Sequence, residues 1–85
     1  MASYSEYLKE AMRRAEYERL EDGSGFYAHI PGFDGLWASG PTIEDTRNEL
    51  FDALDGWLYV NAFVSQLPAP KLEGVELAPP TRSSN

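Results

Sequence analysis

The chain has 85 residues, of which 42% are hydrophobic and 13% aromatic, so it can form one small domain with a modest core. Fourteen acidic and seven basic residues give a net charge of −7, which disfavours nucleic-acid binding by the chain itself and suits a basic partner. The absence of cysteine excludes disulfides, thiolate catalysis and cysteine-ligated metals. Without a signal-like or membrane-spanning apolar run, we expect a cytoplasmic protein that does not enter membranes.

The N-terminal segment has the pattern of a short helix over residues 4–13. Ser3 and Glu6 have the spacing of a capping box, in which each side chain bonds the backbone N–H of the other residue. Basic residues in the last turn suit the negative end of the helix dipole. The apolar stripe consists of Tyr4, Tyr7, Leu8, Ala11 and Met12.

Three short strands should follow as an antiparallel meander. Residues 22–25 are turn formers, and residues 26–30 alternate between the two faces of a strand. The segment 15–21 alternates less strictly, and a hairpin with the next strand is the simplest interpretation. Pro31 cannot donate a ladder hydrogen bond, so pairing should lapse there and resume over residues 36–39.

A long helix should begin after Thr42, a favourable N-cap, and end near Leu67, before Pro68. Gly56 in its middle weakens a helix by up to ~1 kcal/mol relative to alanine, so we expect a bend or a close packing contact there. The apolar stripe of this helix comprises Ile43, Leu50, Leu54, Trp57 and Leu58, with Phe51 beside it.

The second half of this helix, residues 57–64, is apolar nearly all round. Because one small sheet covers only one face, we predict a homo-oligomer, either a dimer or a tetramer; core packing alone is the alternative. The predicted interface residues are Trp57, Tyr59, Val60, Phe63 and Val64.

A further short strand is expected at residues 73–77, with a mobile C-terminal tail at residues 79–85 that has no apolar anchor. Residues 1–78 are therefore predicted to form one α+β domain of order α-β-β-β-α-β. In this domain, a three-stranded antiparallel sheet packs on the long helix.

No constellation in the sequence supports catalysis. His29 is the only histidine, and the acids at residues 16–22 have the spacing of a solvated strand edge. No hydroxyl has a sequence-local base, and residues 32–35 lack the Lys and Ser/Thr of a phosphate loop. We expect no enzymatic activity, no catalytic or metal-binding residue and no cofactor.

One stretch, residues 27–45, carries a recognisable motif. Its matching positions are Ala28, Ile30, Pro31, Phe33, Gly35, Leu36, Gly40 and Thr42, followed by an acidic pair. The pattern resembles the HicB-like antitoxin family of type II toxin–antitoxin systems, over roughly residues 15–77. Two positions depart from it, because Asp34 stands where the family commonly has proline and Thr46 where it has alanine.

The resemblance implies a partial RNase H-like fold, which agrees with the element order above. It implies no nuclease activity, because the RNase H acids have no matching positions. The implied partner is a HicA-like basic toxin that cleaves mRNA and is neutralised by stoichiometric binding. Alternatives are an orphan oligomeric scaffold without a toxin and a vestigial nuclease. Since the DNA-binding domain that often follows in the family is not seen, we do not expect operator binding.

The turn at residues 31–35 supplies a hypothesis for the partner-binding site. Phe33 is not needed for the turn, so it either folds back onto the sheet or anchors a partner. The candidate contact residues are Phe33, Asp34, Trp37 and His29.

Overall fold

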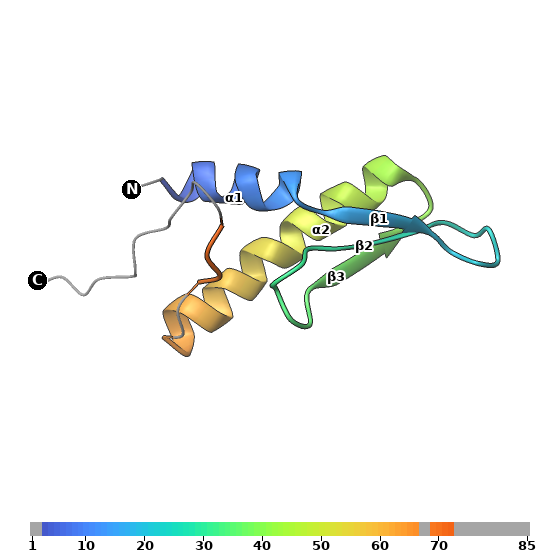
Figure 1. The fold of residues 1–85 in the computed structure, drawn as a ribbon. Coiled ribbons are helices and arrows are strands. Elements are labelled where there is room, and N and C mark those ends of the chain that lie inside the picture. Colours follow the sequence, from blue (N-terminus) through green and yellow to red (C-terminus); the bar gives the residue numbers. More distant parts are fainter. Residues whose placement is uncertain (1–2, 67–68, 73–85) are drawn as a thin grey trace, which may run out of the picture.

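The computed structural model describes residues 3–66 and 69–72 (Figure 1). Its elements are α1 (Tyr4–Arg13), β1 (Glu16–Arg19), β2 (Phe26–His29), β3 (Trp37–Gly40), α2 (Ile43–Leu58) and the π-helix η1 (Tyr59–Val64). The predicted α+β fold, with a three-stranded antiparallel sheet packed on the long helix, is confirmed. The expected strand at 73–77 and the tail at 79–85 lie outside the described residues.

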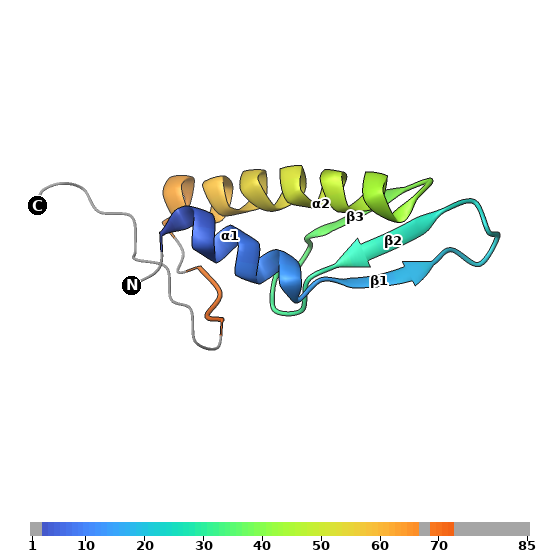
Figure 2. The same cartoon turned by 90° about the horizontal axis from the view of Figure 1, so that it is seen from above.

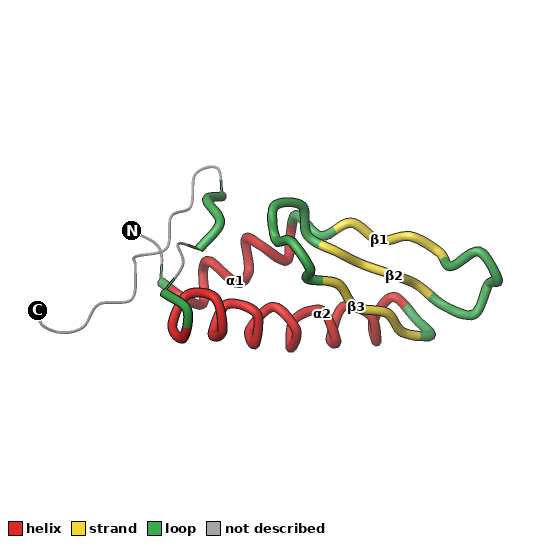
Figure 3. Tube along the Cα trace, turned by 90° about the horizontal axis from the view of Figure 1, so that it is seen from below, coloured by secondary structure: helices red, strands yellow, loops and turns green. Residues whose placement is uncertain are grey.

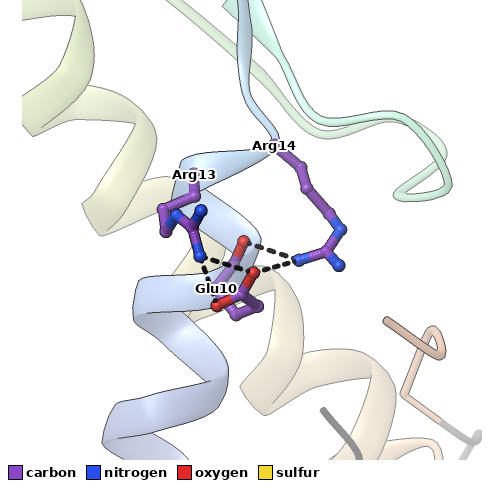
Figure 4. A network of polar contacts seen from close by, with 3 residues as sticks. All are labelled: Glu10, Arg13 and Arg14. Atoms are coloured by element: carbon purple, nitrogen blue, oxygen red, sulfur yellow. Dashed lines mark hydrogen bonds and ion pairs between the residues drawn. The ribbon is translucent and has the colours of Figure 1, made fainter. Parts of the chain in front are cut away.

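Helix α1 begins as its sequence predicts. The Glu6 N–H donates to Ser3 Oγ at 3.1 Å and the Ser3 N–H donates to Glu6 Oε1 at 3.0 Å, which completes the capping box. In the last turn, Arg13 and Arg14 both contact the carboxylate of Glu10, at 3.0 and 2.8 Å (Figure 4). The basic residues therefore pair with an acid on their own helix as well as suiting its dipole.

The sheet is an antiparallel meander of order β1-β2-β3. Ala28 lies between Tyr17 on β1 and Ala38 on β3, and both alanines are buried. Small side chains at these positions let α2 approach the sheet closely. Because strand residues alternate between faces, the neighbours of these alanines along each strand point away from α2.

Helix α2 starts at the predicted N-cap, where the Asp45 N–H donates to Thr42 Oγ1 at 3.0 Å. Its buried row differs from the predicted stripe, because Ile43 is 51% exposed and Thr46 is fully buried. The Thr46 hydroxyl donates to the Thr42 carbonyl at 2.7 Å, so no polar group is left unpaired there. The buried row of α2 is Thr46, Leu50, Leu54 and Leu58, spaced by one helical turn.

Two layers make up the described structure. Helix α2 forms one layer, while α1 and the sheet lie end to end along it in the other (Figure 2). The view from below shows the same arrangement, with no described element over the sheet face turned away from α2 (Figure 3).

Two tyrosines of α1 tie this helix to the rest of the chain. The Tyr4 hydroxyl donates to Asp55 Oδ1 at 2.5 Å, and the Tyr7 hydroxyl donates to the Pro70 carbonyl. Burial, together with the hydrogen bond to Asp55, raises the pKa of Tyr4 to about 12. Burial also raises the pKa of Tyr7 to about 12.

The second helix does not run regularly to Leu67 as predicted. After Leu58 it widens into η1, in which the Ser65 N–H donates to the Val60 carbonyl, five residues back, at 2.8 Å. The side-chain amide of Asn61 donates to the Trp57 carbonyl at 2.8 Å at the start of this wider turn. Such π-turns are rare, and they occur frequently at functional sites.

The first prediction concerns two glycines with opposite surroundings. A Cβ at Gly56 would meet nothing within 4 Å, so the expected close packing contact is absent. Gly56→Ala should stabilise the protein by about 0.5–1 kcal/mol, because alanine is the better helix former. A Cβ at Gly25 would lie 2.3 Å from the Gly40 carbonyl oxygen, so Gly25→Ala should cost about 1–3 kcal/mol. Circular dichroism measurements of thermal unfolding check both substitutions. Equal changes in stability for the two variants would contradict the packing described.

The second prediction concerns alkaline pH. Folding raises both phenol pKa values from 10.0 to about 12, so their stabilising contribution is fully present below pH 10 and is lost as the pH rises through 12. Urea midpoints measured across this window should fall steeply. The tyrosinate absorbance should show that some phenols ionise only as the pH approaches about 12, and Tyr4→Phe should remove one of them. A midpoint that stays constant up to pH 12 would contradict the assignment.

Candidate functional site

The sheet face turned away from α2 carries six side chains from three strands. The register places Glu16, His29 and Trp37 in one row across the sheet. The next row on the same face consists of Glu18, Tyr27 and Ser39. We call these six residues the outer sheet face. It contains two carboxylates and three aromatic rings, but no lysine or arginine.

The three rings lie together on this face. The Tyr27 ring is centred 5.8 Å from the His29 ring and 5.9 Å from the Trp37 ring. Trp37 is 56% exposed, so this face presents a large apolar ring to a partner. Because paired strands hold all three rings, little side-chain freedom would be lost on binding.

The carboxylates lie on β1, beside the rings. Glu16 Oε1 lies 3.4 Å from His29 Nε2, whereas His29 Nδ1 is buried and has no hydrogen-bond partner among the described residues. The His29 ring therefore presents Nε2 to the Glu16 carboxylate. Aromatic faces next to carboxylates are suited to bind the lysine or arginine side chains of a partner.

Rings next to carboxylates give this face groups that can bind a partner. Within residues 3–66 and 69–72, no group of three or more histidines and acids is placed to hold a metal ion. The His29 imidazole contacts the carboxylate of Glu16. Among the described helices, none is both long and apolar enough to cross a bilayer.

The turn at residues 31–35 folds inward. Phe33 is only 3% exposed, and its ring is centred 6.4 Å from that of Tyr7 and 5.1 Å from that of Trp57. The Trp57 Nε1–H donates to the Asp34 carbonyl at 2.9 Å and closes the turn against α2. Of the two interpretations of Phe33, folding back therefore matches the structure. An exposed anchor at this position does not, because the core already takes up the ring.

The structure thus places the predicted contact residues in different surroundings. The structure brings His29 and Trp37 together across β2 and β3, and leaves Asp34 exposed at the turn. Sequence reasoning missed Tyr27, Glu16 and Glu18. The alternation of Tyr27 and His29 with buried neighbours was a visible signal for one face, but their grouping with β1 requires the register.

A second surface lies at the C-terminal end of the long helix. Four large apolar residues of η1 are between 44% and 61% exposed, and we call them the apolar helix end: Tyr59, Val60, Phe63 and Val64. Trp57, the fifth predicted interface residue, is partly buried against Phe33 and hydrogen-bonded to the turn. Its main contacts are within the chain.

Comparison with known proteins identifies the family. The profile of the family described as UPF0150-like matches residues 6–75. The chain belongs to the UPF0150-like family. The crystal structure of TTHA0281 from Thermus thermophilus is similar to this UPF0150-like domain, with a TM-score of 0.84 and 33% identity over 95% of this chain and 99% of that one. No curated protein matches the chain.

The third prediction compares the buried ring of Phe33, in the turn, with the exposed ring of Trp37, on the sheet. Phe33→Ala should destabilise the UPF0150-like domain by about 3–5 kcal/mol, because it empties a buried site between α1 and α2. Trp37→Ala should cost about 1 kcal/mol or less, since only cross-strand contacts are lost. Urea unfolding of both variants measures the difference. A similar loss in both would mean that Trp37 also supports the core.

Proposed function

We propose that this UPF0150-like domain is an antitoxin-like binding module that captures a small, basic, HicA-like toxin and neutralises it stoichiometrically. The observation that carries the proposal is the outer sheet face, where three rings and two carboxylates lie together and none of the six residues is a lysine or arginine. The relation between UPF0150-like and HicB-like domains supports the choice of partner.

Neutralisation would follow from competition for the same cations. A toxin that cleaves mRNA needs basic side chains to hold RNA phosphates. Those side chains would pair with Glu16 and Glu18 and stack on Trp37, so a bound toxin could not hold RNA at the same time. The net charge of −7 adds long-range attraction, which speeds encounter with a basic partner. The proposal places this function in the cytoplasm, where mRNA is available.

The second candidate is an orphan scaffold of the same fold with no toxin partner. The exposed apolar helix end favours it, because a surface of this kind serves self-association without any basic protein. Binding to a toxin and self-association use different surfaces, so the two candidates can be tested separately.

The fourth prediction tests the outer sheet face with any small basic protein that an adjacent reading frame encodes. The unmodified domain should bind it in a one-to-one ratio and stop its mRNA cleavage. Trp37→Ala should weaken binding at least about 30-fold, as expected for a central aromatic contact. Exchange of Glu16 and Glu18 for glutamine should weaken it less and reduce its salt dependence. Calorimetry and an RNA-cleavage assay give the two readouts.

Phe51→Ala is the matched control, because this aromatic is 42% exposed on α2, outside the outer sheet face. It should leave affinity unchanged. If Phe51→Ala and Trp37→Ala weaken binding equally, the outer sheet face is not the contact surface. If no neighbouring basic protein binds at all, the orphan scaffold replaces the antitoxin as the favoured function.

A further inference from the structure

We propose that the apolar helix end joins two copies of this chain in a two-fold symmetric dimer. Tyr59 and Phe63 are spaced by four residues, as are Val60 and Val64, so the surface consists of an aromatic row beside a valine row. All four side chains are exposed in the single chain, although each is large and apolar. Monomeric proteins rarely leave such side chains adjacent and uncovered.

The charge pattern selects a second copy as the occupant. From residue 56 to residue 70 the sequence has no Asp, Glu, Lys or Arg, although 25% of the whole chain is charged. Asp55 immediately precedes this uncharged stretch, and its carboxylate already accepts the hydrogen bond from Tyr4. A basic partner would find no charged side chain within residues 56–70, whereas the outer sheet face offers it two carboxylates.

Two copies face the opposite constraint, because each carries a net charge of −7 and they repel one another overall. They can associate closely only where neither buries an unpaired carboxylate. The apolar helix end meets this requirement.

The surface is also self-complementary. A two-fold axis beside η1 lets the valine row of one copy pack against the aromatic row of the other, which is the reciprocal pattern of an isologous interface. The Phe63 ring is already held by neighbours, with its centre 6.4 Å from the Tyr4 ring and 6.3 Å from the Tyr59 ring. A ring placed in advance loses little freedom on association.

Dimerisation at this position would leave the outer sheet face accessible. The sheet packs on the N-terminal half of α2, while η1 extends the opposite end of the same helix (Figure 1). A dimer joined at η1 therefore presents two separate outer sheet faces. This inference does not depend on the proposed function, because a scaffold without a toxin would dimerise in the same way.

The fifth prediction measures the mass of the full-length chain by sedimentation equilibrium. The unmodified protein should be a dimer at about tens of micromolar. Val60→Asp should raise the dimer dissociation constant at least about 100-fold, because it places a carboxylate from each copy in the interface. Val64→Asp should also raise the dimer dissociation constant. Agreement between the two variants would show that the effect comes from the interface and not from misfolding at one position. Circular dichroism should show both variants folded.

Ile43→Asp is the matched control, since Ile43 and Val60 are both 51% exposed and lie at opposite ends of the long helix. It should leave the dimer intact. Higher salt should strengthen the dimer by screening like charges, whereas it should weaken a complex with a basic toxin. A monomeric unmodified protein, or a dimer that survives both valine substitutions, would overturn the proposal without affecting the proposed toxin site.

Discussion

The row of buried side chains along α2 is the constraint on which the remaining structure depends. Thr46, Leu50, Leu54 and Leu58 are completely buried and follow one another at single-turn spacing. One row on one helix supports only one packed layer, and both the sheet and α1 lie against it (Figure 2). The other face of the sheet is therefore left without a covering layer among the described elements, and its side chains are available for a partner.

The inward turn between β2 and β3 connects this core to the sheet. Phe33 fills the space between α1 and α2, and the Trp57 indole holds the turn through the Asp34 carbonyl. Because β3 follows directly, this contact also sets where Trp37 emerges on the outer sheet face. The packing of the core and the exposed position of Trp37 are thus parts of one arrangement, although only Trp37 is free to meet a partner.

Charge separates the two exposed surfaces into different roles. The outer sheet face combines aromatic rings with acids, which suits cations, while the apolar helix end has no charge and suits an equally uncharged surface. In the arrangement that we propose, the acidic protein binds itself at one end and a basic protein at the other without competition between the two contacts. The opposite salt dependence that we expect of these two proposed associations follows from the same division.

Local signals in the sequence determined where the two α-helices begin and the order of the elements. The Ser3–Glu6 capping box, the Thr42 N-cap and the alternation in β2 all depend on residues within a few positions of each other, so they were predictable. Only the tertiary structure decided which apolar residues are buried. Ile43 was expected in the buried stripe but is exposed, and Thr46 is buried instead. The direction of α2 over the sheet, which no local pattern encodes, selects the row that faces inward. The burial of Phe33, the π-turn at η1 and the grouping of Glu16 with His29 and Trp37 likewise depend on contacts between segments far apart in sequence.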